Sequence, residues 1–119
     1  MSRRAKNLGD WGEKQAGFFL ERQGFKIIER NYYTTVGEID IIAAKSGDYY
    51  FIEVKTRNGK SDLANDLAVT KCKRFRLHKT VKHYCYHRQI ADKSLILAGL
   101  VVVIDSIAKK VNFRFCVFY

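Results

Sequence analysis

The sequence predicts an α/β fold in which a mixed β-sheet is flanked by helices, with the element order αβββαββ. Three observations indicate this class: a helical segment near the start of the chain, three runs of strand character directly after it, and a long basic helical stretch that separates them from two final apolar runs. With 119 residues the chain lies in the usual size range of one domain, so we expect a single domain over residues 1–119.

The first helix is expected over residues 7–23, and Gly24 is its C-terminal stop. Glu13 lies on the stripe of this helix that would pack against a sheet. A carboxylate there has two interpretations, a role in a functional site or a position at the edge of the stripe beside a basic neighbour, and the residues alone favour neither. The other members of the stripe are Ala16, Gly17 and Leu20.

Three strands should follow this helix. The first is expected over residues 25–33. The second carries Gly-Glu-Ile-Asp at residues 37–40, and the third carries Ile-Glu-Val-Lys at residues 52–55. Between them, Lys-Ser-Gly-Asp at residues 45–48 is typical of a turn. These two strands should therefore form an antiparallel hairpin that contains charged residues where Val or Thr would be usual.

The turn position brings two of these acids together. A loop centred on residues 46–47 pairs the strands so that Asp40 lies directly opposite Glu53, because side chains alternate between the faces of a strand. Like charges opposed in this way are destabilising. A divalent cation such as Mg²⁺ or Mn²⁺, held by the carboxylate oxygens, would offset the repulsion. Lys55, two residues after Glu53, should point to the same place.

This hairpin has an ordinary surface explanation beside the functional one. Acids that alternate with apolar residues are also typical of the solvated face of a half-exposed hairpin. Here, however, Ile42 and Phe51 continue the acidic face with apolar side chains, which is more typical of a pocket wall. The functional interpretation is therefore favoured. The opposite face is expected to be apolar and to contain Ile39, Ile41, Ala43, Ile52 and Val54.

A long helical stretch is expected over residues 63–87, after a loop at residues 58–61. Many helices have a solvated charged face, but residues 71–90 contain no Asp or Glu that could form the usual ion pairs with the Lys and Arg of this helix. Charge of one sign favours contacts with a phosphate backbone. The predicted nucleic-acid-binding residues are Arg57, Lys71, Lys73, Arg74 and Arg76.

Charge and cysteine content narrow the partner and the compartment. Twenty-two Lys and Arg against twelve Asp and Glu give a net charge of +10 and a pI near 9.7, which favour nucleic acid as the partner. Cys72, Cys85 and Cys116 have no paired spacing and should be reduced, half-buried packing residues. The basic N-terminal segment lacks the apolar stretch of a signal peptide. The apolar run at residues 95–104 is shorter than the roughly 20 residues of a membrane span. We expect a cytoplasmic protein that does not bind membranes.

His83 and His87 are four residues apart on the basic helix, a spacing that can bind a transition metal. No third ligand is evident, so we expect a solvated or phosphate-contacting pair. The last two strands are expected over residues 98–106 and 111–119.

Four motifs together resemble those of a known family. They are the helix pattern of Gly9, Gly12, Glu13 and Ala16, the pair at residues 30–31, and the two strand motifs at residues 37–43 and 51–57. This combination is similar to that of the YraN-type family of uncharacterised endonucleases, in the PD-(D/E)XK, restriction-endonuclease-like superfamily. The resemblance covers residues 8–57, about half of the chain. It implies a restriction-endonuclease-like core.

The resemblance also implies roles for individual residues. Asp40 and Glu53 would be Mg²⁺ or Mn²⁺ ligands, and Lys55 would be the catalytic lysine, with an electrostatic role favoured over that of a general base. Glu13 would add a carboxylate from the first helix, and Lys71 matches a lysine of the following helix. The implied enzyme hydrolyses phosphodiester bonds of nucleic acid, with DNA favoured over RNA and with branched or structured DNA among the candidate substrates. This chain departs from the family where Arg-Phe-Asp is usual, because it carries Gly99, Leu100 and Val101 there.

Two other classes of function remain open. The first is a non-catalytic nucleic-acid-binding module that retains the nuclease fold, which Mg²⁺ binding without cleavage would indicate. The second is an assembly protein whose apolar final strands form a homodimer. That alternative explains neither the net charge nor the paired acids. The aromatic surface that would serve a homodimer consists of Phe113, Phe115, Phe118 and Tyr119.

Overall fold

The computed structural model describes residues 3–59, 71–90 and 94–118, with the side chains of residues 3–5 and 71–74 outside the description. The predicted order of elements is confirmed. No helix among the described residues is long and apolar enough to cross a membrane. The predicted helical residues 63–70 lie outside the described residues. The elements are α1 (Arg3–Arg22), β1 (Lys26–Tyr33), β2 (Glu38–Lys45), β3 (Asp48–Asn58), α3 (Lys71–His87), β4 (Leu95–Asp105) and β5 (Lys110–Val117).

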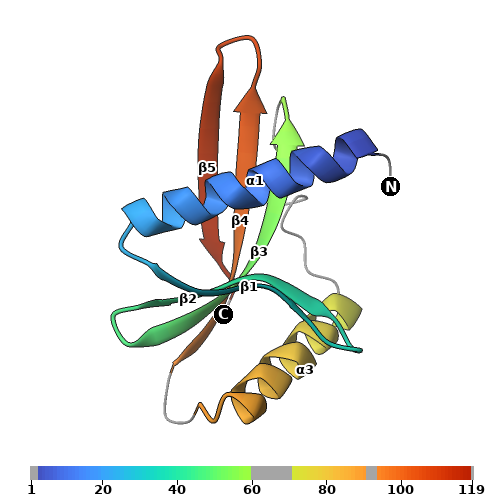
Figure 1. The fold of residues 1–119 in the computed structure, drawn as a ribbon, viewed down its shortest axis with the longest axis vertical. Helices are drawn as coiled ribbons and strands as arrows, with labels where there is room; N and C mark the ends of the chain where they lie inside the picture. The colour runs from blue at the N-terminus through green and yellow to red at the C-terminus, as the bar shows by residue number, and fades with distance from the viewer. Residues whose placement is uncertain (1–2, 60–70, 91–93, 119) are drawn as a thin grey trace.

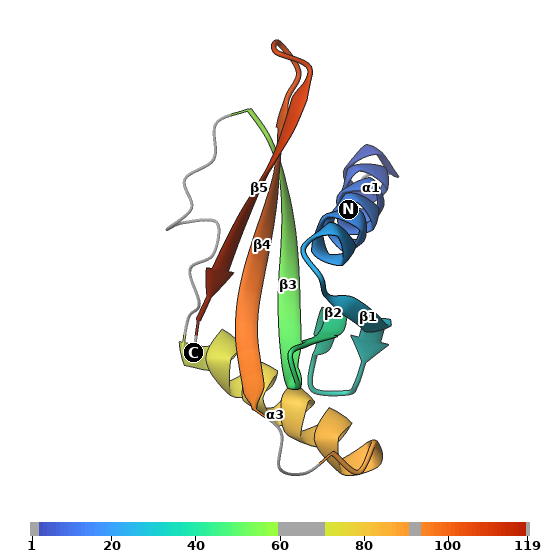
Figure 2. The ribbon, with the colours of Figure 1, turned by 90° about the vertical axis from the view of Figure 1, so that its left-hand side faces the viewer.

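The five strands form one mixed sheet in the order β1-β2-β3-β4-β5 (Figure 1). Neighbouring strands are antiparallel except for β3 and β4, which are parallel. A parallel pair needs a crossover connection, and the segment that contains α3 supplies it. Figure 2 shows α1 and α3 on different sides of this sheet. The predicted α/β class, a mixed sheet flanked by helices, is confirmed.

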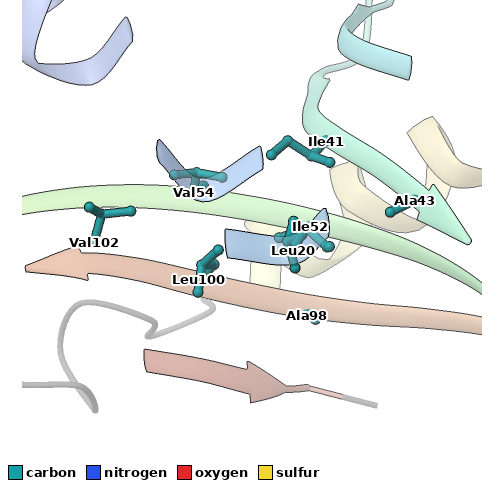
Figure 3. Close-up of a cluster of buried hydrophobic side chains, with 9 residues drawn as sticks. Leu20, Ile41, Ala43, Ile52, Val54, Ala98, Leu100 and Val102 are labelled. Atoms are coloured by element: carbon teal, nitrogen blue, oxygen red, sulfur yellow. The ribbon is translucent and has the colours of Figure 1, made fainter. Parts of the chain in front are cut away.

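The core has two parts because each helix packs against a different face of the sheet. On one face, Ala16 and Leu20 of α1 pack with Ile52 of β3 and with other apolar residues of β2 and β4, all buried (Figure 3). On the other face, Tyr84 of α3 packs with Phe51 of β3. Neighbouring residues of β3 thus serve opposite layers, as strand alternation requires.

Two glycines set the position of α1. Gly24 has φ +93°, and this left-handed residue ends the helix as predicted, with Phe25 N–H donating to the Leu20 carbonyl at 3.0 Å. Gly12 lies directly against the side chain of Thr56 on β3, and a Cβ at this position would overlap it. The missing side chain lets α1 approach β3 closely, and Glu13 is the next residue on the helix.

The hairpin between β2 and β3 has the predicted register. Ser46 and Gly47 both have positive φ, 53° and 86°, which is typical of a type I′ turn. The turn pairs Lys45 with Asp48, and the same register continues as far as Ile41 opposite Ile52. The pairing stops immediately before Asp40.

Candidate active site

Asp40 occupies a break in the pairing of β2 with both of its neighbours. The ladder between β1 and β2 omits Asn31 and Asp40, and Asn31 has a left-handed φ of 53°. The ladder between β2 and β3 ends one residue after Asp40, at Ile41. In place of a ladder bond, Val54 N–H donates to Asp40 Oδ2 at 2.8 Å. The sheet therefore fixes this carboxylate through its own backbone.

The break also changes which way Ile39 faces. Strict alternation predicted that Ile39 would share the face of Ile41 and Ala43. Instead, Ile39 packs in the α3-side cluster with Ile42, whereas Ile41 and Ala43 pack on the α1 side. The prediction is wrong at Ile39 because the irregular backbone at Asp40 shifts the phase of the alternation.

Asp40 and Glu53 line the same cavity, which has a volume of about 200 Å³. The cavity lies where the start of β2 and the middle of β3 approach α3. From α3, Arg76 brings a cation to its wall. The two predicted metal ligands thus share one concave site. The complete lining consists of Gly37, Glu38, Ile39, Asp40, Ile52, Glu53, Arg76, Leu77 and Thr80.

Lys55 is ion-paired with one carboxylate of this cavity and acts electrostatically on another. Its Nζ is 3.2 Å from Glu53 Oε1 in a half-buried ion pair. Its positive charge also lowers the pKa of Asp40, which places the ammonium group within electrostatic reach of that side chain. Lys55 is not itself part of the cavity lining.

Burial raises the pKa of Asp40 to about 6, and the negative charges of Glu38 and Glu53 add to this effect. The hydrogen bond from Val54 N–H and the charge of Lys55 oppose it. The site thus holds acids that repel one another in a partly dehydrated space. A bound cation would relieve both penalties.

The donor set fits a hard divalent cation. The described parts of the chain contain no cluster of three or more His, Cys, Asp or Glu side chains arranged to hold a metal ion. Mg²⁺ does not require one, because it is usually bound by one or two carboxylates together with waters and substrate phosphate oxygens. Asp40 and Glu53 supply two carboxylates on one cavity wall.

Glu13 does not line this cavity. It lies on α1 in a separate hollow of about 490 Å³, together with Asp10 and Arg30. Burial raises the pKa of Glu13 to about 7, and the charges of Asp40 and Asp10 contribute next. The structure therefore places Glu13 within electrostatic reach of Asp40 and in a different pocket.

The predicted nucleic-acid-binding residues have different positions. Arg76 lines the cavity. Arg57 lies on β3 and donates from Nη1 to the Thr56 carbonyl at 3.1 Å. The remaining three lie in the first turn of α3, and their side chains are outside the described residues: Lys71, Lys73 and Arg74.

Three polar residues near the site were absent from the predicted set. Glu38 lines the cavity and raises the pKa of Asp40, and its spacing of two residues from Asp40 was a usable signal. Asp10 was also detectable, because it precedes Glu13 by three residues on a helix. Thr80 lines the cavity, is 1% exposed and donates to the Arg76 carbonyl at 2.8 Å. Nothing in the sequence distinguishes Thr80 from other helix threonines.

The residues at the departure from the family pattern lie next to the site. On β4, Gly99 pairs with Glu53 and Val101 pairs with Lys55. Gly99 has no side chain, so the position beside Glu53 contributes only backbone.

The predicted histidine pair and the two described cysteines are not part of the cavity lining. His83 and His87 are exposed, and their rings lie in tilted contact with centroids 4.2 Å apart. The His83 Nδ1 is 2.7 Å from the Tyr32 hydroxyl, which the sequence did not indicate. Cys85 and Cys116 are free and half-buried as predicted, and Cys72 lies among the undescribed side chains.

The fold is that of an α/β protein whose five-stranded mixed sheet is flanked by helices, and it carries a cavity lined by carboxylates. The chain matches the sequence model of the uncharacterised protein family UPF0102 over residues 12–117, and it belongs to that family. This match confirms the resemblance to the YraN-type family.

Individual relatives agree with this assignment. A UPF0102 protein of Alkaliphilus metalliredigens is 46% identical over 92 residues, which cover 77% of this chain and 76% of the relative. One from Roseiflexus castenholzii is 43% identical over 77 residues, with 65% and 62% covered. One from Clostridium acetobutylicum is 41% identical over 97 residues, with 81% and 75% covered. Their names state the family and no activity.

Proposed function

We propose that this protein is a metal-dependent endonuclease that hydrolyses phosphodiester bonds of nucleic acid, with DNA favoured over RNA. The observation that carries the proposal is the shared cavity of Asp40 and Glu53, with Lys55 ion-paired to Glu53 and Arg76 in the wall. Acids beside two cations suit a substrate that brings its own negative charge and a metal ion. The net charge of +10 supports a polyanionic substrate.

Each residue of the site has a task in this proposal. Asp40 and Glu53 would hold Mg²⁺ or Mn²⁺, which when bound supplies an activated water and stabilises charge on the scissile phosphate. Val54 N–H orients Asp40 and leaves the other carboxylate oxygen available. Lys55 would neutralise the phosphate oxygens as negative charge develops on them. Arg76 would bind a phosphate at the cavity wall, where a guanidinium donates two parallel hydrogen bonds.

A second function is favoured by a specific observation. In the described residues the metal-binding side chains form no cluster of three or more, and Gly99 supplies no side chain next to Glu53. These features would suit a nucleic-acid-binding module that retains the nuclease fold without cleaving. Such a module would bind Mg²⁺ and nucleic acid, and its substrate would stay intact.

A cleavage screen separates the two functions. Purified protein would be incubated with single-stranded, duplex, flapped and four-way-junction DNA and with RNA, in the presence of Mg²⁺, Mn²⁺ or EDTA. The nuclease proposal expects products that require the metal and are absent in EDTA. Binding of the same substrates without any product in either metal would contradict it and favour the binding module.

A further inference from the structure

The solvent-facing side of α3 carries two aromatic side chains with two lysines between them. Phe75, Lys79, Lys82 and Tyr86 recur at spacings of four and three residues, which place them on one face of the helix. We call these four residues the α3 stripe. Phe75 is 61% exposed and Tyr86 is 81% exposed, and both lysines are exposed as well. Tyr84, on the opposite side of the helix, is buried, so the stripe faces away from the core.

The two aromatic rings of the stripe contribute little to the fold. Large aromatic side chains usually bury most of their surface, and exposed ones are enriched at binding surfaces. Lys79 Nζ lies 5.0 Å from the centroid of the Phe75 ring, a cation–π arrangement. A ring with a cation beside it offers a nucleotide both a stacking surface for the base and a charge for the phosphate.

The charge around the stripe selects an anionic occupant. Residues 71–90 contain no Asp or Glu. Glu29 of β1 reaches this helix, and its carboxylate is already paired with Arg88 at 3.0 Å. Such a surface repels a basic partner and attracts a phosphate backbone.

The stripe leads away from the candidate active site. Arg76, in the cavity wall, follows Phe75 directly on α3. From Phe75 to Tyr86 the helix rises roughly 16 Å, which matches about five nucleotides at the spacing of about 3.4 Å per residue of a stacked strand. In a duplex the base faces are stacked on one another, so exposed protein rings have nothing to contact. A single strand presents those faces.

We propose that the α3 stripe binds unpaired nucleotides of the substrate. Phe75 and Tyr86 stack on bases, and Lys79 and Lys82 contact the phosphates between them. This inference rests on the proposed function, since it takes nucleic acid as the ligand. It narrows the substrate to one with a single-stranded segment next to the cleaved bond.

The test measures binding alone, in EDTA, by fluorescence anisotropy with a labelled oligothymidine of about 12 nucleotides and a duplex of the same length. The variant Phe75→Ala with Tyr86→Ala should bind the single strand at least about 30-fold more weakly, because stacking worth about 1 kcal/mol or more is lost at each of two bases. Its duplex affinity should stay within about twofold. Its salt dependence should match that of the wild type, because no charge is removed.

Two controls make the result specific to stacking. Phe75→Tyr with Tyr86→Phe keeps both rings and should bind the single strand like the wild type. Phe18→Ala removes an exposed aromatic ring from α1 and should also have no effect. Melting curves check that each variant is folded. We expect the double alanine variant to fold, because Phe75 and Tyr86 are both exposed.

The outcomes separate this inference from the proposed function. The double alanine variant could keep its single-strand affinity, or lose affinity equally for single strand and duplex. Either result would contradict the binding of unpaired nucleotides by the α3 stripe and would leave the nuclease proposal standing. If the α3 stripe binds a protein partner instead, the single-strand affinity should be unchanged in the double alanine variant. Wild-type protein that binds neither form of nucleic acid would overturn both proposals.

Discussion

Two acidic regions of this protein differ in how the charge of their carboxylates is controlled. In the cavity on the α3 side, the carboxylate of Asp40 accepts a hydrogen bond from the sheet backbone and lies near the charge of Lys55. In the hollow on the α1 side, Glu13 has Asp10 and Arg30 as neighbours. The Arg30 guanidinium lowers the pKa of Glu13 but donates its hydrogen bond to the Glu13 backbone carbonyl, at 3.5 Å.

This difference sets the charge of each region near neutral pH. Asp40, with a pKa of about 6, is mostly ionised at pH 7. Glu13, with a pKa of about 7, is close to half protonated. A metal ligand must be deprotonated. In the proposed metal site, Asp40 would therefore be the ligand available near pH 7, and any participation of Glu13 would depend on pH.

The largest effect should come from the carboxylates of the cavity. Asp40→Asn and Glu53→Gln should each lower metal-dependent cleavage by more than about 100-fold, since even indirect changes around a metal site cost 10- to 100-fold. Lys55→Ala should also abolish cleavage but retain Mg²⁺ binding, because a lysine ammonium has no lone pair to donate. Cleavage rates and calorimetric titration with Mg²⁺ measure the two properties.

A matched surface change provides the control for these variants. Glu21→Gln neutralises an exposed acid on α1 and should cleave at the wild-type rate. Cleavage retained by both cavity variants would mean that the cavity acids are a structural cluster.

The second effect concerns the basic residues of α3, next to the cavity. Replacing three α3 cations with alanine should weaken binding to duplex DNA of any sequence and reduce the salt dependence, by about 0.9 in log–log slope for each phosphate that is no longer neutralised. The same number of changes on the β5 side should leave the slope nearly unchanged. Binding that is insensitive to salt in the wild type would contradict a role of α3 in binding phosphates. The α3 set is Lys73, Arg74 and Arg76, and the control set is Lys109, Lys110 and Arg114.

The third effect concerns the pH dependence of the α1 side. If Glu13 assists the metal, Mg²⁺ affinity should fall by up to about tenfold per pH unit as the pH drops below about 7, because the carboxylate takes up a proton. Glu13→Gln should remove this dependence between about pH 6 and about pH 7. Asp10→Asn should keep the dependence and move it to lower pH, because the Asp10 charge raises the pKa of Glu13. An unchanged profile in Glu13→Gln would exclude Glu13 from the metal site.

Much of the cavity could be predicted from local patterns. The turn residues at 46–47 determined the register of β2 and β3, and this register brought Asp40 and Glu53 to one site. Gly24 indicated the end of α1 because only a left-handed residue continues the chain there. In each case the signal is short in sequence and depends on backbone geometry alone.

What could not be predicted depends on contacts between distant segments. Ile39 lies on the α3 side of the sheet because the ladder between β1 and β2 is interrupted at Asn31 and Asp40. The alternation of hydrophobic residues in the sequence does not reveal this interruption. The separate hollow of Glu13 follows from where α1 crosses β3, a position set by Gly12 against Thr56. The cavity wall from α3 follows from helix packing, so Thr80 carried no signal in the sequence.

The smallest effect is on stability, and it distinguishes an active site from a structural cluster. Burial and acidic neighbours raise the pKa of Asp40 from 3.8 to about 6 in the folded state, so folding disfavours its charge. A raised carboxylate pKa makes stability highest below about pH 4, decreasing as the pH rises through about 6 and level above that. The shift of roughly two units corresponds to at most about 3 kcal/mol at pH 7.

Asp40→Asn should therefore stabilise the metal-free protein. Asn retains an oxygen to accept the Val54 N–H hydrogen bond but adds an amide group that needs a partner, so we expect a net gain of about 1 kcal/mol, or about 4 °C in Tm. The gain should be present at pH 7 and absent near pH 4. Mg²⁺ should raise the Tm of the wild type and not that of the variant, because a ligand stabilises only the state that binds it. Clear destabilisation of the variant at pH 7 with cleavage intact would identify Asp40 as part of a structural network, since removing one partner of a buried network usually lowers stability.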